Sequence, residues 1–294
     1  MDGIFIINKE KGHSSHDVVM KMRKILHTKK VGHCGTLDPL ATGVLPILVG
    51  KATKIEKYLV EHKKKYIAVI QLGEKKSTGD LEGKSIEKMA VDLDKLTEQN
   101  IKNIFQKMIG KSEQIPPMYS AIKINGKKLY EYAREGTKIE IPPRKIEIYD
   151  LKLLNIDKKN KTIEFEVYCS KGTYIRVLCE NIAEKLGTVG YMKELTRTLV
   201  GNFNIEDSIK INEIEQLNEN ELESKIINIE KIFENKGKIV LNNYKLKHFL
   251  NGVKLTQKMK DGIVCIYNEN KEFIGIGIIK DELLKRDVII WLWF

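Results

Sequence analysis

The chain has 294 residues, with 51 lysine and arginine residues against 40 aspartate and glutamate residues, so its formal net charge is +11. This balance favours a polyanionic partner, nucleic acid before an anionic membrane. The four cysteines form no C-x-x-C pair, so neither a zinc motif nor a thioredoxin-like motif is indicated. The first residues do not resemble a signal peptide, and no run reaches the roughly 18 apolar residues of a membrane span. We therefore expect a cytoplasmic protein without a membrane partner.

The first quarter of the chain alternates strand-like and helix-like segments, which predicts a mixed α/β core. The run SSHD at 14–17 resembles a capping box, and apolar residues follow it at helical spacing to about Leu26. The other segments expected here are strands at 3–8, 44–49 and 66–72, a glycine-rich loop at 31–37 and a helix at 51–61.

The middle of the chain, residues 114–144, has a different character. It contains proline pairs at 116–117 and 142–143, which favour extended, turn-rich backbone. It also contains Asn125-Gly126, the strongest short signal for a β-hairpin. We interpret this segment as an insertion on the core.

The last third of the chain divides by charge. Residues 203–236 hold nine acidic residues and four lysines, whereas residues 237–294 hold ten basic and six acidic residues. This change predicts two domains, 1–236 and 237–294. The second contains the β-rich runs VCIYN, FIGIGII and VIIWLWF, and is near the lower size for independent folding. Before the division, the pattern predicts a strand at 163–167 and a helix at 174–186 that stops at Gly187.

A single acidic residue, Asp38, lies in the stretch VGHCGTLDPLATGVLPILVG. Taken alone, it is interpreted most simply as the N-cap of a helix with Pro39 at the first helical position, which does not exclude catalysis. Three neighbouring motifs are weaker. LVGKAT departs from the pattern of a phosphate-binding loop at two positions. The HC dipeptide is a poor nucleophile pair, because adjacent side chains in an extended loop point apart. The H-x-x-H run near the N-terminus is a poor metal site, because no third ligand is evident.

The motif GHCGTLDPLATGVLP, followed by GKATK, matches every fixed position of the pattern G-H-x-G-x-L-D-P-x-A-x-G-x-L. With the later runs KKYIAVIQLG, TGDLEG, QIPPMYSAIKINGKKLYEYAREG, SKGTYIRVL and LTRTLVGNF, it resembles the TruB family of bacterial tRNA pseudouridine-55 synthases over residues 3 to about 203. A region similar to the family's PUA-type domain follows. The resemblance implies an α+β fold: a mixed-sheet pseudouridine synthase catalytic core with an insertion, plus a small β-rich PUA-like C-terminal domain.

The resemblance implies an enzyme that isomerises uridine 55 in the T-loop of tRNA to pseudouridine, without a cofactor or a metal. The family's nucleophile corresponds to Asp38, and the family's arginine corresponds to Arg176 in GTYIR. An apolar, glycine-lined pocket raises the pKa of a carboxylate, whereas an adjacent arginine lowers it by about 1–3 units. Arg176 is therefore expected to keep Asp38 ionised. Attack on ribose C1′, attack on uracil C6 and elimination all stay open as the route.

The family's substrate contacts fall on four further positions of the chain. Tyr66, in KKYIAV, corresponds to a tyrosine that can stack on the flipped base and move a proton. His33, Tyr174 and Leu195 correspond to family residues near the everted nucleotide. Without the resemblance, Tyr66 would be interpreted as a core residue and His33 as a loop residue with a local hydrogen bond.

The chain departs from the family pattern at two positions. Lys9-Glu10 stands where Lys-Pro is common, and Thr196 stands where a basic residue is common. The first change is expected to affect a turn, and the second an RNA contact.

Residues 1–65 hold thirteen basic and six acidic residues, so phosphate contacts and salt-dependent RNA binding are expected. The insertion is expected to clamp the T-arm of tRNA, and the C-terminal domain to contact the acceptor region. No obligatory protein partner is indicated. The alternatives are a non-catalytic RNA-binding or tRNA-folding protein, and a related synthase that acts on another RNA.

Overall fold

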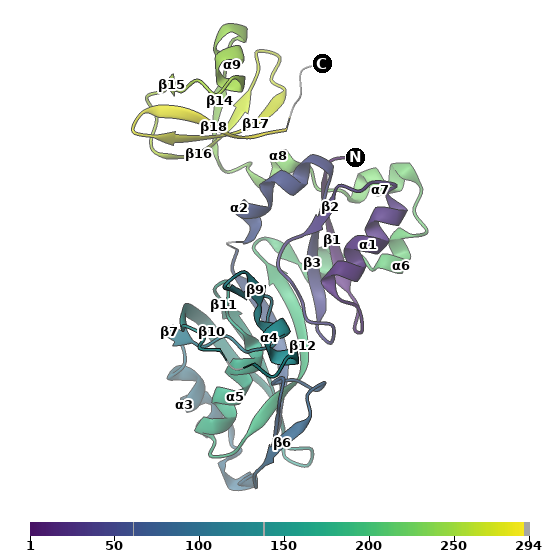
Figure 1. Cartoon of the computed structure of the whole chain (residues 1–294), viewed down its shortest axis with the longest axis vertical. Coiled ribbons are helices and arrows are strands. Elements are labelled where there is room, and N and C mark those ends of the chain that lie inside the picture. The colour runs from purple at the N-terminus through teal and green to yellow at the C-terminus, as the bar shows by residue number, and fades with distance from the viewer. Residues whose placement is uncertain (61, 138, 291–294) are drawn as a thin grey trace.

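The computed structural model describes residues 1–60, 62–137 and 139–290. Its larger sheet contains β1 (Gly3–Lys9), β2 (Val31–His33), β3 (Thr42–Val49), β4 (Lys64–Leu72), β7 (Gly110–Gln114), β10 (Arg144–Asp157), β11 (Thr162–Cys169), β12 (Gly190–Val200) and β13 (Phe203–Asn204). The strand order is β1-β3-β12-β4-β11-β10-β7, with β2 beside β3 and β13 beside β12 (Figure 1).

Helices and short turns of helix connect these strands. The helices are α1 (Ser15–Ile25), α2 (Glu56–Val60), α3 (Glu98–Gln106), α4 (Leu129–Arg134), α5 (Ile175–Lys185), α6 (Ile211–Ile214), α7 (Glu219–Lys225), α8 (Ile229–Ile232) and α9 (Asn243–Leu250), and the 3₁₀ turns are Gly50–Ile55, Leu93–Lys95 and Ile205–Asp207. The predicted α+β class with a mixed sheet is confirmed. Within the described ranges, no helix is both long and apolar enough to cross a bilayer.

The N-terminal elements follow the sequence pattern closely. In the predicted capping box, the Asp17 amide donates to the Ser14 hydroxyl at 3.1 Å and the Ser14 amide donates to the Asp17 carboxylate at 2.8 Å. The predicted loop at 31–37 is wrong for its first three residues, which form β2 along β3. That pairing satisfies backbone groups that a loop would leave to water. The predicted helix at 51–61 is a 3₁₀ turn followed by α2, and Glu61 lies outside the described residues.

Over β4 and β10–β12 the core lies on the face of the larger sheet that α3 and α5 cover, whereas β1 and β3 are buried on both faces and contribute to two clusters. Residues of β4 alternate between buried and half-buried, as a strand with one covered face requires. The rings of Phe105 in α3 and Phe165 in β11 pack 5.8 Å apart, and full burial of such a side chain stabilises the fold by about 1.5–3 kcal/mol. The predicted strand at 163–167 and the helix ending at Gly187 are both confirmed, and Gly187 has a φ of 77°.

A short parallel seam between β3 and β12 joins the two halves of the larger sheet. Thr42 pairs with Thr196 and Gly43 pairs with Arg197, whereas the ladders on either side are long and antiparallel. Gly43 has a φ of 100°, and a Cβ atom there would lie 2.2 Å from the carbonyl oxygen of Arg197. Only glycine allows this backbone conformation and this close approach.

The predicted insertion is an excursion between two neighbouring strands. The chain leaves the sheet after β7 and returns as β10, which pairs antiparallel with β7. In between, Asn125 and Gly126 both have positive φ, at 51° and 81°, and join β8 (Lys123–Ile124) to β9 (Lys127–Lys128) as the predicted hairpin. A separate hairpin precedes α3 and consists of β5 (Glu74–Lys76) and β6 (Ser85–Lys88).

A second sheet begins at Gly237, directly after the predicted division of the chain. Its strands are β14 (Gly237–Val240), β15 (Leu255–Thr256), β16 (Gly262–Tyr267), β17 (Phe273–Lys280) and β18 (Leu283–Ile289), in the order β14-β16-β17-β18-β15. Figure 1 shows this sheet and α9 as an upper lobe. Asp287 of β18 accepts from Lys57 Nζ at 2.5 Å and from the Tyr58 hydroxyl, which ties the lobe to α2. The last four residues of the run VIIWLWF lie outside the described residues, and the division into domains 1–236 and 237–294 stays a prediction.

Candidate active site

A cavity of about 550 Å³ opens between the loop that precedes β3 and strand β12. Five of the six predicted site residues line it, namely Asp38, Tyr66, Tyr174, Arg176 and Leu195. They come from four separate parts of the chain, so the fold alone brings them together. His33 does not line this cavity. It ends β2 opposite Ile47, and its ring Nδ1 is buried without a hydrogen-bond partner in the described part of the chain.

Asp38 lies in the loop between β2 and β3, with its side chain 37% exposed. The interpretation of this residue as a helix N-cap is wrong, because the chain makes one turn, in which the Ala41 amide donates to the Asp38 carbonyl, and then enters β3. Long-range bonds hold the loop on both sides of the carboxylate. The Leu37 amide donates to the buried Ser15 hydroxyl at 2.9 Å, and Lys9 Nζ donates to the Pro39 carbonyl at 3.2 Å.

Arg176, in the first turn of α5, forms an ion pair with Asp38. Its Nε lies 3.2 Å from Asp38 Oδ2, and the residue is only 5% exposed. The other two nitrogens of the guanidinium are held by backbone. Nη1 donates to the Thr78 carbonyl at 3.0 Å and Nη2 donates to the Tyr119 carbonyl, within the insertion, at 2.7 Å. The guanidinium therefore has one orientation, with its Nε edge directed at the carboxylate.

A second carboxylate, Asp80, lies on the far side of the same guanidinium. Its Oδ2 is 3.6 Å from Arg176 Nη1, while its Oδ1 accepts from the Thr78 hydroxyl and the Glu82 amide. Asp80 is 6% exposed. Sequence reasoning quoted the run TGDLEG but missed this residue as part of the site. The available signal was an acidic side chain between two glycines in a turn.

The pKa of the Asp38 carboxyl is raised above its ordinary value. Burial is the main cause, and Asp80 adds to it, whereas the positive charges of Arg176 and Lys9 act in the opposite direction. Both effects expected from the sequence, desolvation and an opposing arginine, are present. A partly desolvated carboxylate with a fixed cation at one oxygen leaves the other oxygen available to attack an electrophilic carbon.

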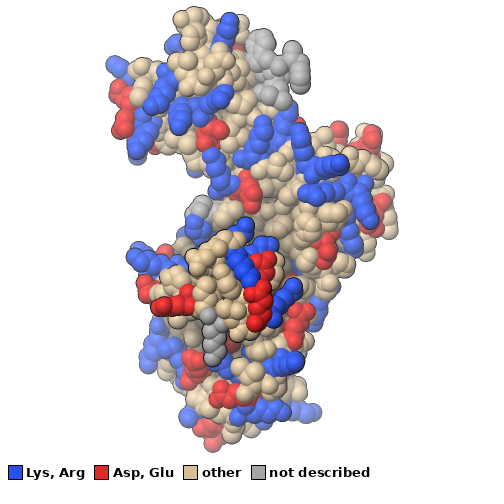
Figure 2. Space-filling model, in the orientation of Figure 1, with Lys and Arg blue, Asp and Glu red and all other residues tan. Residues whose placement is uncertain are grey.

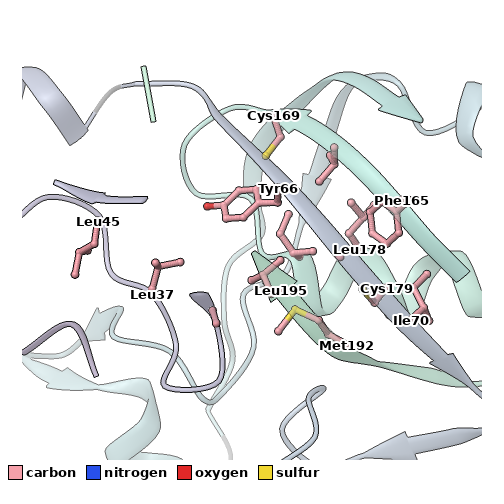
Figure 3. Close-up of a cluster of buried hydrophobic side chains, with 14 of the residues drawn as sticks. Leu37, Leu45, Tyr66, Ile70, Phe165, Cys169, Leu178, Cys179, Met192 and Leu195 are labelled. Carbon is pink, nitrogen blue, oxygen red and sulfur yellow. The ribbon is translucent and has the colours of Figure 1, made fainter. Parts of the chain in front are cut away.

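Tyr66 and Arg197 face the cavity from neighbouring strands. Figure 3 shows the Tyr66 ring projecting from β4, with its hydroxyl directed toward the side where Leu37 lies. Burial raises the pKa of Tyr66 to about 12, while the charge of Arg197 and a hydrogen bond from it act in the opposite direction. Sequence reasoning missed Arg197 although it quoted LTRTLVGNF. The signal was a basic residue two positions after Leu195, where the strand alternation predicts an apolar residue.

Family models match three consecutive parts of the chain. They are described as TruB family pseudouridylate synthase (N terminal domain) at residues 23–175, tRNA pseudouridylate synthase B C-terminal domain at 176–234, and Pseudouridine synthase II TruB, C-terminal, at 237–286. The chain belongs to the TruB family. The resemblance carried by the sequence motifs is thereby confirmed.

Named relatives of this TruB-family chain match it over nearly its whole length. The tRNA pseudouridine synthase B of Clostridium kluyveri is 44% identical over 97% of this chain and 98% of its own. That of Clostridium acetobutylicum is 46% identical over the same shares. Among solved structures, a Cbf5-Nop10-Gar1 complex matches with a TM-score of 0.70 and 26% identity, covering 94% of this chain and 78% of that chain. An H/ACA RNP bound to a substrate RNA containing 2′-deoxyuridine shares the fold, with a TM-score of 0.70 and 22% identity.

The two departures from the family pattern both lie beside the cavity. Lys9 is 1% exposed, and its ammonium donates to the carbonyls of Glu10, His13 and Pro39, so the backbone alone receives it and the Glu10 side chain is not needed. Thr196 is half-buried, and its hydroxyl is used within the sheet. Its hydroxyl lies 2.8 Å from that of Thr42 and bridges the seam.

The surroundings of the cavity are basic. Its lining includes Lys64, Arg144, Lys145 and Lys171. Figure 2 shows lysine and arginine side chains over both lobes of the visible face, with several around the waist between the lobes. Tyr174 closes one wall, where Gln114 of β7 exchanges two hydrogen bonds with its backbone, at 2.7 and 3.1 Å. The basic residues of the lining suit an anionic polymer, and the cavity between them suits one uncharged ring of that polymer.

Proposed function

We propose that this chain converts uridine 55 in the T-loop of tRNA into pseudouridine, with Asp38 as the nucleophile. The observation that carries the proposal is the Asp38–Arg176 ion pair, at 3.2 Å, in a cavity that Tyr66 also lines. Membership of the TruB family and two relatives named tRNA pseudouridine synthase B support the substrate and the reaction.

The reaction exchanges one bond of the ribose for another without loss of atoms. The N1–C1′ bond breaks with its electron pair going to N1, and a C5–C1′ bond forms. The proton at C5 then leaves, and N1 takes up one proton. Whether Asp38 attacks C1′, attacks C6 or promotes elimination, it acts as the ionised carboxylate, and Arg176 stabilises that form.

The target base has to leave its stack before it meets the carboxylate, which costs a few kcal/mol. Tyr66 from β4 and Leu195 from β12 lie on neighbouring strands and both line the cavity, so they offer two walls for the flipped ring. We assign Tyr66 to stacking and proton movement, and Tyr174 and Leu195 to base contacts. His33, at the end of β2, is assigned to the space near the everted nucleotide rather than to the cavity itself.

The RNA around the base is proposed to lie along the basic lining of the cavity. The insertion at 114–144 contacts the T-arm, since its Tyr119 backbone already reaches Arg176. The sheet of residues 237–289, as part of a separate domain 237–294, contacts the acceptor region. We place this activity in the cytoplasm, where tRNA is modified. An RNA-binding protein without catalysis does not need a half-exposed carboxylate held by a buried arginine, which favours the enzyme.

The test uses an unmodified tRNA transcript treated with wild type, Asp38→Asn or Asp150→Asn. Asp150 is a matched control, because it is a surface carboxylate that pairs with Lys152 at 3.3 Å and does not line the cavity. Pseudouridine is mapped by position, and tRNA affinity is measured for each protein. We expect wild type and Asp150→Asn to convert one T-loop uridine, and Asp38→Asn to bind the transcript without converting it. Binding by all three proteins with no conversion by wild type would sink the proposal for this substrate.

A further inference from the structure

Arg197 in β12 is a buried cation, and none of the acidic side chains in residues 1–60, 62–137 and 139–290 neutralises it. It is 1% exposed, and none of the described carboxylates makes an ion pair with it. Its guanidinium instead donates to three backbone carbonyls, from Nε to Val44 at 2.8 Å, from Nη2 to Gly35 at 2.9 Å and from Nη1 to Thr36 at 3.4 Å. Removal of a charge from water without an opposite charge is expensive, so such a residue is expected to have a specific use.

The three carbonyls belong to the segment that carries Asp38. Gly35 and Thr36 precede the carboxylate, and Val44 follows it in β3, whereas Arg197 itself belongs to β12. The guanidinium therefore crosses the seam and fixes both ends of the loop that carries Asp38 against the other half of the sheet. A Cβ atom at Gly35 would lie 3.4 Å from Arg197 Nη1, so the loop backbone passes close over the charge.

The positive charge of Arg197 acts on Tyr66. Arg197 and Tyr66 are register partners across β12 and β4, both belong to the buried face, and both line the cavity. The groups that favour the charged form of Arg197 are the Tyr66 hydroxyl, through charge and a hydrogen bond, and the Cys34 thiol. Arg176, the other buried arginine that lines the cavity, forms ion pairs with Asp38 and Asp80. Tyr66 and Asp38 are thus each provided with a separate guanidinium.

We propose that Arg197 is a positioning residue for the isomerisation, which stabilises the deprotonated hydroxyl of Tyr66 and holds the loop of Asp38 across the seam. The proposal rests on the proposed function. In the step concerned, the phenolate oxygen of Tyr66 takes the proton from C5, and the electron pair of the C5–H bond restores the C5–C6 double bond. N1, which kept the electron pair of the broken glycosidic bond, takes a proton from water, and Tyr66 returns its proton to water.

Arginine suits this position better than lysine. Its planar fork donates in three directions at once, which three carbonyls of different residues require, and it stays charged in a buried site. Burial makes the Tyr66 proton hard to remove, with a pKa near 12, so a nearby fixed cation is the available means of lowering that barrier. Without Arg197, the phenolate would have to form against burial and against the negative charges of Cys169 and Asp38.

The first measurement follows the ionisation of Tyr66 directly and does not depend on catalysis. 3-Fluorotyrosine is placed at position 66, and its ¹⁹F shift is titrated in the otherwise unchanged chain and in chains with Arg197→Met, Arg197→Gln or Arg197→Lys. We expect the midpoint to rise by about 1–3 pH units in the two neutral variants, and to rise in Arg197→Lys as well, because a buried lysine loses its charge below the pH at which Tyr66 ionises. Arg23→Met is the control, because Arg23 Nη2 donates to the Val31 carbonyl at 3.1 Å but does not line the cavity, and its midpoint should not move.

The second measurement is the single-turnover rate on tRNA. A rise of 1–3 units in the tyrosine midpoint corresponds to a rate about 10- to 1,000-fold lower at a fixed pH below it, with unchanged tRNA affinity. A more acidic difluorotyrosine at position 66 should then recover much of the rate in Arg197→Gln. An unmoved ¹⁹F midpoint in both neutral variants overturns the electrostatic role, whatever the rate. A moved midpoint with no rate loss leaves the charge effect in place but contradicts proton transfer by Tyr66, which belongs to the proposed function.

Discussion

Replacement of Gly43 by alanine tests whether the seam between β3 and β12 sets the geometry of the site. The new Cβ atom would lie 2.2 Å from the Arg197 carbonyl oxygen and 2.9 Å from both its carbonyl carbon and its amide nitrogen, and these are backbone atoms. The strands therefore have to separate. Strain at a φ of 100° is expected to cost about 1–3 kcal/mol, and the overpacked contact about 1–3 kcal/mol more.

Gly110→Ala is the matched control for the strain alone. Gly110 begins β7 in the same sheet with a φ of 112°, and a Cβ atom there has nothing within 4 Å. The difference between the two variants isolates the seam contact, about 1–3 kcal/mol in the free energy of unfolding. In a thermal melt followed by circular dichroism, this corresponds to a midpoint roughly 2–12 °C lower for Gly43→Ala than for Gly110→Ala.

The same change is expected to affect catalysis. Asp38 is held from the β3 side of the seam and Arg176 from the other side, so separation of the strands lengthens their 3.2 Å contact. A misplacement of about 1 Å at a reacting group lowers a rate by about 100-fold. The single-turnover rate is compared below both melting midpoints. Equal stability of the two variants, with wild-type rates in both, would refute the view that the seam positions the carboxylate.

Three further predictions follow from the same site. Arg176→Met removes the strongest opposition to the raised pKa of Asp38, so the acid limb of the pH–rate profile should move to higher pH. Asp80→Asn removes a charge that raises the pKa of Asp38, so its acid limb should move to lower pH even as the maximal rate falls. Acid limbs that move in the same direction in Arg176→Met and Asp80→Asn would contradict the assignment. Thr42→Val breaks the bond to Thr196 and should lower the free energy of unfolding by about 0.5–1.5 kcal/mol in a denaturant titration.

The sequence predicts those elements whose cause is local. Ser14 and Asp17 lie three residues apart, and the side chain of each accepts a hydrogen bond from the backbone amide of the other. The start of α1 can therefore be predicted from residues 14–17 alone. Asn125-Gly126 adopts positive φ at both positions wherever it joins two strands, so the hairpin in the insertion is equally visible. Motif-level resemblance adds Asp38, whose role no local pattern specifies.

The errors and omissions arise from contacts between distant segments. Residues 31–33 form a strand because they pair with β3, and the chain after Asp38 forms β3 rather than a helix because β1 pairs with it over seven residues. Asp80 and Arg197 join the site because β12 lies between β3 and β4, an order that no single segment encodes. An arginine in the place of an apolar residue within a strand-like run is the sign that the sequence offers for Arg197. It indicates that the residue has a specific role but does not indicate which residues it contacts.

The position of the site follows from the way in which the sheet is joined. Along β1–β3 and β4–β12 the backbone ladder holds neighbouring strands, but at the seam it ends after two pairs, and the cavity opens where the ladder stops. Side chains supply the missing bonds there. Arg197 donates to carbonyls of the β3 side, and Arg176 donates to Thr78 and Tyr119 while it reaches Asp38. Since guanidinium groups make these bonds, the contacts that hold the two halves together also bring positive charge to the carboxylate and the phenol to which we assign the chemistry.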